Sequence, residues 1–267
     1  MGARSGKAGG MRTRVRIALL LPALLSPCLV LAAQDGEPPE RVGSFVEDAS
    51  PQPLDTLTSR CPAPPGLCDF GYPVLSRACA VKDTTGLGTF GGEDYVVVRY
   101  LRETVMDEGA PYGPFTCGTD EVALAALSGD GRARVVWRDA TDRVAYFISS
   151  VDLHRTPGGE RVLSITYCLN GTGGCAQGLL IWDGNAWRRL ERDDSWDAAY
   201  RTLPDGYRRH KSAAIDLEAL TWRESLAGPG DPNCCPSGYI DFRLAIIGGK
   251  LAVKSYDIAV PEEGTGK

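Results

Sequence analysis

Apolar and polar residues alternate along several short runs of the chain, the pattern of strands that bury one side. In residues 239–247, Phe242 and Leu244 fall on one face of an extended chain. Asp241 and Arg243 fall on the opposite face. Such alternation is typical of an antiparallel meander with one face in water.

Strand-like runs recur in three successive units that share one order: strand, long loop, strand, tight turn, strand. The units cover residues 91–153, 158–206 and 212–258, and an additional strand at Val144 to Leu153 extends the first. Gly, Asn and Asp at the turns, between β-branched and aromatic runs, favour hairpins. We therefore expect a mostly β domain over residues 61–260, built of repeated antiparallel meander units.

Two arrangements of these units fit the pattern. The first is a set of stacked antiparallel sheets with a core between them. The second is a small propeller-like domain that also uses the entry segment, residues 61–92, in which only residues 72–75 look extended. Because a propeller usually has about four to eight blades, three units favour stacked sheets.

One short helix is expected near residues 195–203. Ser195 can cap its start, and Trp196 and Ala199 lie on one apolar stripe. Pro204 follows and stops the helix. This helix would bridge the second and third units.

Residues 1–33 have the order of a secretory signal peptide: basic residues, an apolar run, then Ala32 and Ala33. A membrane-spanning helix is the alternative, but it needs about 20 uninterrupted apolar residues. Pro22 and Pro27 interrupt this run. We expect cleavage near Ala33 and export to the periplasm or the extracellular space.

The segments at the two ends of the domain are polar. Residues 34–60 are acidic and rich in proline, which predicts a flexible linker. Residues 261–267 are expected to form a loose tail.

Cleavage makes the chain strongly acidic. The full sequence of 267 residues carries a net charge of −5, and the signal segment holds five basic and no acidic residues. The mature chain then has 24 basic against 34 acidic side chains, a net charge of −10. Phosphate backbones and anionic lipids repel such a chain, so we expect no nucleic-acid partner. The mature sequence also has no segment apolar enough to span a membrane.

Eight of the nine cysteines lie beyond the signal segment: Cys61, Cys68, Cys79, Cys117, Cys168, Cys175, Cys234 and Cys235. An even number in an exported chain predicts disulfides. Cys168 and Cys175 bracket a glycine-rich turn and are the first expected bridge. Cys61 with Cys68 is the next local pair, and Cys79 with Cys117 follows by elimination.

Cys234 and Cys235 are adjacent, which leaves their role open. As a vicinal pair they are a candidate redox site, because strained bonds are easier to reduce. As free thiols they could hold a soft metal. Two separate long-range bridges are the structural alternative, and they would give Cys79 or Cys117 a different partner.

The stretch around these two cysteines resembles a known family. Residues 231–238, Asp-Pro-Asn-Cys-Cys-Pro-Ser-Gly, precede a strand, the turn Gly248-Gly249-Lys250 and another strand. This order is similar to the C-terminal part of bacterial secreted proteins of the LppP/LprE lipoprotein type, over about the last 50 residues. The resemblance implies a bacterial envelope setting and supplies no catalytic residue. Pro27 before Cys28 departs from a lipid-attachment signal.

The motifs that resemble cofactor or metal sites lack the neighbouring elements or ligands that such sites need. Gly86 to Gly91 matches the dinucleotide fingerprint G-x-G-x-x-G, but a strand follows it where the phosphate site needs a helix. Asp130 and Asp183 lie in turns that lack the alternating ligands of a calcium loop, so hairpin turns are expected. The sequence therefore predicts no cofactor and no metal.

Catalytic residues are not evident either. The sequence has two histidines, His154 and His210, neither in a metal-ligand spacing. A triad assembled in space from His210 and a serine stays open. No catalytic residue can be assigned from these patterns.

Trp182 and Trp187 flank the turn at Gly184 and Asn185 and should face each other across a hairpin. The pair either stabilises the hairpin or offers apolar ring faces for stacking a sugar. We therefore expect an exported, non-enzymatic binding or structural module, with an envelope protein or a glycan as the possible partner. The alternatives are a thiol, redox or soft-metal function at Cys234 and Cys235, and carbohydrate binding at the tryptophans.

Overall fold

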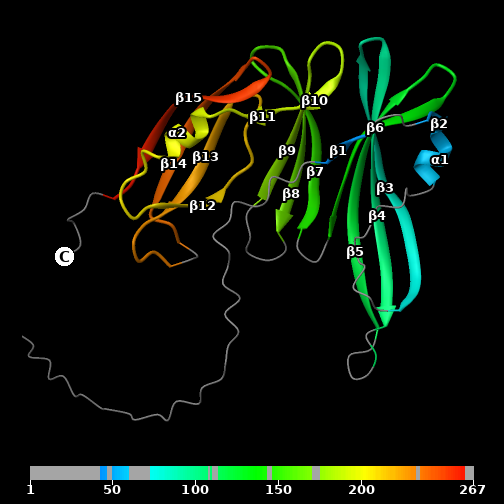
Figure 1. Ribbon diagram of the computed structural model, residues 1–267, viewed down its shortest axis with the longest axis horizontal. Helices are drawn as coiled ribbons and strands as arrows, with labels where there is room; N and C mark the ends of the chain where they lie inside the picture. The colour runs from blue at the N-terminus through cyan, green and yellow to red at the C-terminus, as the bar shows by residue number, and fades with distance from the viewer. Residues whose placement is uncertain are drawn as a thin grey trace, which may run out of the picture. The chain divides into compact units, whose positions relative to one another are not determined.

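The computed structural model describes residues 43–46, 50–59, 73–107, 109, 114–142, 146–169, 175–232 and 235–261 (Figure 1). Most of them lie in antiparallel strands. The expected mostly β fold is confirmed. The expected signal peptide, the Cys61–Cys68 bridge and residues 262–267 of the tail lie outside the described residues.

The first sheet, sheet A, is a meander of four long strands with two short strands added at one edge. Its order is β1-β6-β5-β4-β3, and β2 also pairs with β6. The strands are β1 (Ser44–Phe45), β2 (Gln52–Pro53), β3 (Val74–Phe90), β4 (Glu93–Asp107), β5 (Pro114–Leu127) and β6 (Arg132–Asp142). All of its pairings are antiparallel.

β3 corrects the expectation of an irregular entry segment over residues 61–92. Val74–Phe90 pairs with β4 along its length, although the register shifts at three places. Small residues and glycines replace the usual alternation in this run, so the side-chain pattern does not reveal a strand. The backbone ladder with β4 holds the segment extended, and the shifts leave it with β-bulges.

Sheet B is a four-stranded meander in the order β10-β9-β8-β7. Its strands are β7 (Tyr146–Arg155), β8 (Arg161–Leu169), β9 (Cys175–Trp182) and β10 (Trp187–Arg189). β7 corrects the expected boundary between the first two units, because it pairs with β8 and not with sheet A. The pairing sets Leu153 opposite Leu163, and both pack into the core between sheets A and B. The β-branched and aromatic residues of this run identified a strand without identifying its neighbour.

Sheet C has the order β11-β15-β14-β13-β12. Its strands are β11 (Glu191–Arg192), β12 (Arg208–Ser212), β13 (Thr221–Ala227), β14 (Gly238–Ile247) and β15 (Lys250–Ala259). β11 is parallel to β15, and the other pairings are antiparallel. On β14, Phe242 and Leu244 are buried as the alternation predicts.

Sheet B shares one core with sheet A and another with sheet C. On β8, Leu163 and Ile165 pack with residues of sheet A, whereas Val162 packs with residues of sheet C. On β9, Leu180 belongs to the first core and Leu179 to the second. Since neighbouring residues of a strand point to opposite faces, both faces of sheet B are covered and the three sheets are stacked.

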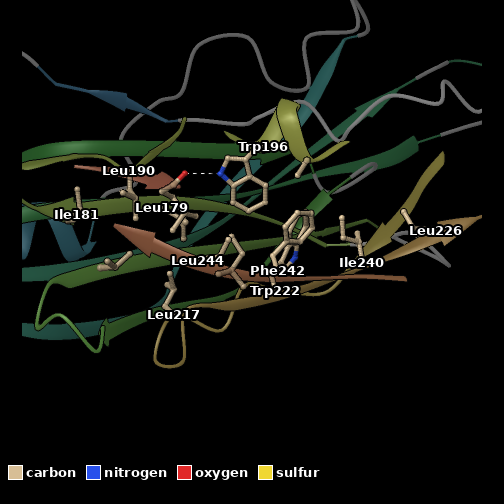
Figure 2. Packing of buried hydrophobic residues seen from close by; sticks show 14 residues of the cluster. Leu179, Ile181, Leu190, Trp196, Leu217, Trp222, Leu226, Ile240, Phe242 and Leu244 are labelled. Atoms are coloured by element: carbon tan, nitrogen blue, oxygen red, sulfur yellow. Dashed lines mark hydrogen bonds between the residues drawn. The ribbon is translucent and has the colours of Figure 1, made fainter. Parts of the chain in front are cut away.

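The predicted helix is present as α2 (Ser195–Tyr200). Trp196 and Ala199 are buried, as the apolar stripe predicts. The N-cap residue is Asp194, not Ser195, and its side chain makes no capping hydrogen bond. The Ser195 hydroxyl donates to Asp193. Figure 2 shows Trp196 beside Trp222 and Phe242, in the core between sheets B and C.

Residues 43–46 and 50–59, called the N-terminal arm, correct the expected flexible linker. The arm contributes β1, β2 and α1 (Leu54–Ser59), and Leu57 is only 1% exposed. Its low apolar content predicts a tether. Strand pairing with β6 and one buried leucine nevertheless seat it on sheet A.

Candidate functional site

The two tryptophans that suggested a sugar platform lie in the core between sheets A and B. Trp187 pairs directly with Trp182, as the hairpin predicts. Their ring centroids are 5.8 Å apart, and both rings contact Phe90 and Tyr95. Trp187 is only 5% exposed. The four rings pack edge to face or tilted, with Trp182 partly buried, so they fill space between the layers.

A serine, a histidine and a carboxylate meet where sheets B and C pack. His154 Nε2 lies 2.9 Å from Ser164 Oγ, and His154 Nδ1 lies 3.9 Å from Glu218 Oε1. This is the order of groups in a hydrolytic triad. The triad that the sequence left open was centred on His210, which is not part of this arrangement.

Two features prevent Ser164 from acting as a nucleophile. Ser164 is 1% exposed, on the face of β8 that points toward sheet C. Its hydroxyl also donates, at 3.5 Å, to the carbonyl oxygen of Asp152. A general base must accept the serine proton, and the Ser164 hydroxyl already has the Asp152 carbonyl oxygen as an acceptor. The three groups therefore form a chain of polar contacts where sheets B and C pack.

His210 lies on β12, close to the loop that contains the adjacent cysteines. In this loop the Asp231 carboxylate accepts from the amides of Gly228 and Ser237, at 2.6 and 2.8 Å, and from the Ser237 hydroxyl at 2.8 Å. These hydrogen bonds, with a smaller contribution from the charge of His210, lower the pKa of Asp231. The ionised Asp231 carboxylate thus links the two ends of the loop, at Gly228 and Ser237.

Cys235 in this loop is exposed, and its amide donates to the Pro232 carbonyl oxygen at 3.0 Å. Cys234 lies outside the described residues. Of the candidate redox pair, the structure therefore describes only Cys235. It is exposed on a loop that the hydrogen bonds of Asp231 hold together.

A charged pair that the sequence did not single out is buried on the face of sheet A that the arm covers. Arg102 Nε lies 2.8 Å from Glu121 Oε1, and Glu121 is 5% exposed. Burial raises the pKa of Glu121, and the charges of Arg102 and Arg138 offset part of that rise. The nearby Tyr100 hydroxyl donates to Leu57 O at 2.7 Å, and burial raises the pKa of Tyr100 to about 12.

The sequence contains one sign of this buried pair, namely which positions of the strand face inward. Arg102 follows Val98 and Tyr100 at every second position of β4, which places a charge on a buried face. A charge in an inward position needs a partner on the next strand. Glu121 on β5 is that partner.

A similar pair lies between α2 and sheet C. Glu224 is 3% exposed and accepts from Tyr200 OH at 2.8 Å and from Arg209 Nε at 3.0 Å. The Arg209 guanidinium also lies 4.1 Å from the centre of the Tyr200 ring. Burial raises the pKa of Tyr200, and the Glu224 charge adds to the effect. The phenol therefore remains a hydrogen-bond donor at neutral pH.

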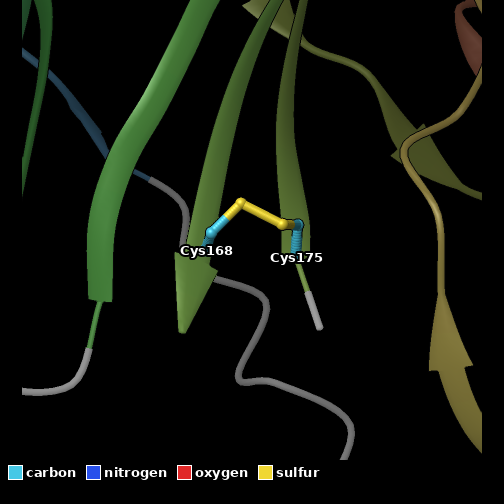
Figure 3. Close-up of a disulfide and its surroundings, with 2 residues drawn as sticks. All are labelled: Cys168 and Cys175. Atoms are coloured by element: carbon cyan, nitrogen blue, oxygen red, sulfur yellow. A yellow bond between two sulfur atoms is a disulfide. The ribbon is translucent and has the colours of Figure 1, made fainter. Parts of the chain in front are cut away.

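The Cys168–Cys175 bridge is confirmed (Figure 3). The two residues are direct partners in the β8–β9 ladder, with a Cα–Cα distance of 4.1 Å. This position joins the ends of two strands of the central sheet.

Replacing both Cys168 and Cys175 by Ser should lower the free energy of unfolding by about 2 to 3 kcal/mol, because the bridge closes a short loop in the unfolded chain. Denaturant titration followed by circular dichroism measures the change. An unchanged midpoint would show that the bridge does not limit the unfolded chain.

The pairing of Cys79 with Cys117 is incompatible with the register of sheet A. Cys79 faces Arg102 of β4, and Cys117 faces Thr104 on the other side of the same strand. Two strand spacings, about 9.5 Å, separate them, whereas bridged Cα atoms lie within about 7 Å. Each is disulfide-bonded, so each has a partner other than the one expected.

The remaining motifs lie in hairpin turns. Gly86 to Gly91 spans the end of β3 and the start of the turn into β4, where the dinucleotide site would need a helix. Asp183 accepts from the Asn185 and Ala186 amides of the β9–β10 turn, which lowers its pKa. Asp130 accepts from the Arg132 amide in the β5–β6 turn. Within the described ranges, no group of three His, Cys, Asp or Glu side chains is arranged to hold a metal ion.

Neither helix in the described part of the chain has the length and hydropathy to cross a membrane. Comparisons with protein-family models, with curated proteins and with solved structures gave no significant match.

Proposed function

We propose that this chain is an exported binding module, in which a rigid stack of β-sheets presents a surface to a partner. The proposal rests on one observation: the polar side chains that catalysis would need bind to other groups of the protein. His154, Ser164 and Glu224 make hydrogen bonds within the interior of the stack. Groups used in this way stabilise the scaffold, because Ser164 and Glu224 are buried and His154 is partly buried.

Export is the second part of the proposal. Residues 1–33 have the order of a signal peptide, and the Cys168–Cys175 bridge is the kind of bond that persists outside the reducing cytosol. The C-terminal resemblance to bacterial envelope proteins supports the same compartment. Expression with the native N-terminus, followed by cell fractionation and N-terminal sequencing, tests it. A mature chain that begins near Gln34 is expected, and an uncleaved chain in the cytosol would exclude export.

A screen with fluorogenic esters, amides, glycosides and phosphoesters tests the absence of turnover. No turnover above background is expected from the purified protein. Turnover that persists through purification and is lost in His154→Ala or His210→Ala would replace the binding function with a catalytic one. His154→Gln is the matched control, because its amide keeps a polar contact to Ser164 without an imidazole.

A thiol function at Cys234 and Cys235 is the second candidate. The fixed base of the loop and the exposed position of Cys235 favour it. Alkylation of the native protein with iodoacetamide, before and after a mild dithiol reductant, measures the redox state of these residues. Labelling of the 228–238 peptide only after reduction supports the thiol function. Resistance of this peptide under conditions that reduce other bridges would exclude it.

A further inference from the structure

Cys79 and Cys117 lie on one face of sheet A, the face that points away from sheet B. Cys79 is directly opposite Arg102 of β4, and Cys117 is directly opposite Thr104. Both β4 positions are on the same side of the strand as Val98, which packs with the N-terminal arm and not with sheet B. Each cysteine is disulfide-bonded, and the register excludes a bridge between the two.

The cysteines that could bond to these two lie in two places. Cys168 and Cys175 bond to each other. Of the others in the mature chain, Cys61 and Cys68 precede β3, and two adjacent cysteines, called the vicinal pair, precede β14. Sheet C, which contains β14, lies on the far side of sheet B from sheet A (Figure 1). Two layer spacings, about 20 Å, therefore separate β14 from sheet A.

The loop before β14 is too short to cross that distance. Its two ends are joined by the Asp231 carboxylate, which accepts from a backbone amide at each end. Neither cysteine of the vicinal pair is more than three residues from Ser237, so their Cα atoms lie within about 11 Å of it. A disulfide adds at most about 7 Å between Cα atoms. Bridges from this loop to Cys79 or Cys117, which also point away from sheet B, are therefore excluded.

The stretch that contains Cys61 and Cys68 is attached at both ends to elements on sheet A. Cys61 follows α1 by two residues, and α1 lies on the outer face of the sheet through Leu57. Cys68 precedes Pro73 by five residues, and Pro73 O accepts from the Asp107 amide at 2.9 Å at the end of β4. Both cysteines are therefore close enough along the chain to bond to sheet A.

We propose that Cys79 and Cys117 bond to the two cysteines that precede β3. The vicinal pair then bonds only to itself or to a thiol of another molecule. This assignment replaces the local bridge expected between Cys61 and Cys68, and it excludes the long-range structural bridges that the sequence left open for the vicinal pair.

The vicinal pair is in this arrangement a site for thiol–disulfide exchange with a dithiol. The two thiols of the reductant lose two electrons and two protons and form a disulfide, and the bond of the vicinal pair takes them up and opens to two thiols. The exposed position of Cys235 gives an attacking thiolate access to this bond. Exposed bonds are reduced more readily than structural ones, so this bond opens first. This step rests on the thiol function proposed above and names its substrate class.

Tryptic mapping of the exported protein, purified and alkylated with iodoacetamide without reductant, tests the pairing. Trypsin separates the cysteines concerned into four peptides, which are residues 61–77, 78–82, 103–132 and 224–243. The first three peptides should be recovered as one disulfide-linked species. The fourth, which contains the vicinal pair, should be recovered alone and without an alkyl label.

Reduction of the native protein with dithiothreitol tests the exchange. Peptide 224–243 should gain two alkyl labels at a dithiothreitol concentration at least about tenfold lower than the peptide that contains the Cys168–Cys175 bridge. Cys235→Ser should leave Cys234 labelled without any reductant, because its bonding partner is gone. Cys175→Ser is the matched control, since it removes a bridge in sheet B and should leave peptide 224–243 unlabelled.

Linkage of peptide 224–243 to any other peptide would overturn the proposal, and so would an internal bridge in peptide 61–77. In the Cys235→Ser variant, a Cys234 that stays unlabelled would also overturn it. The expected linkage with a vicinal pair that resists reduction as strongly as Cys168–Cys175 would instead overturn the thiol function. Failure of the pairing and failure of the proposed thiol function are therefore distinguishable.

Discussion

Trp196→Ala is expected to lower the free energy of unfolding by about 3 to 5 kcal/mol, the usual cost of removing a large buried aromatic side chain. Trp196 is 2% exposed, and its ring centre lies 5.2 Å from that of Trp222 and 5.3 Å from that of Phe242. Its Nε1 donates to Leu251 O at 2.7 Å (Figure 2). The substitution leaves both a cavity and a buried carbonyl oxygen without its donor.

Urea titration followed by far-ultraviolet circular dichroism measures this loss. Ile247→Ala is the control, because Ile247 is 63% exposed and its truncation should change stability by less than about 0.5 kcal/mol. A loss below about 1 kcal/mol for Trp196→Ala would mean that α2 does not form part of the core.

Arg102→Met is expected to cost about 3 to 5 kcal/mol near neutral pH, because it leaves the Glu121 carboxylate buried without its nearest cation. Arg223→Met is the matched control. Arg223 makes a two-point ion pair with Asp241, at 2.5 and 2.7 Å, on the exposed face of sheet C. Removing that pair should cost at most about 1 kcal/mol. Equal losses in the two variants would contradict the buried position of Glu121.

The pH dependence of stability gives a second measurement on Glu121. Its pKa in the folded protein is raised above the ordinary 4.5, chiefly by burial. The folded state therefore binds the proton more tightly than the unfolded state, and protonation stabilises the fold. This contribution is fully present below pH 4.5 and is lost as the pH rises through the raised pKa.

Glu121→Gln removes that contribution. The difference in unfolding free energy between wild type and Glu121→Gln should shift in favour of the wild type as the pH falls from 7 toward 4.5. Denaturant titrations across this range test the sign. A difference that does not change with pH would show that Glu121 has an ordinary pKa.

Alternation was sufficient to predict the strands whose two faces differ. β14 was predicted because its apolar residues recur at every second position, β4 because it is rich in β-branched and aromatic residues, and α2 because Trp196 and Ala199 recur at helical spacing. These patterns can be seen in a short stretch of sequence, because the residue type at each position reflects whether that position is buried. They also place Cys168 opposite Cys175, since a short turn fixes the register of a hairpin.

Features that depend on a distant partner could not be predicted in this way. β3 is extended because it pairs with β4, and its own small residues show no alternation. β7 was recognised as a strand and assigned to the wrong sheet, since its pattern does not encode its neighbour. Arg102 and Glu121 are far apart in sequence, so their pairing appears only when β4 and β5 are in register.

Sheet B has consequences for how this molecule unfolds. Neighbouring residues of β8 belong to two different cores, so a shift of one position would send each to the wrong side. If either outer sheet detached, one apolar face of the central sheet would be exposed to water. The two outer sheets should therefore lose their structure together, in one cooperative transition with a single midpoint for probes placed in either core.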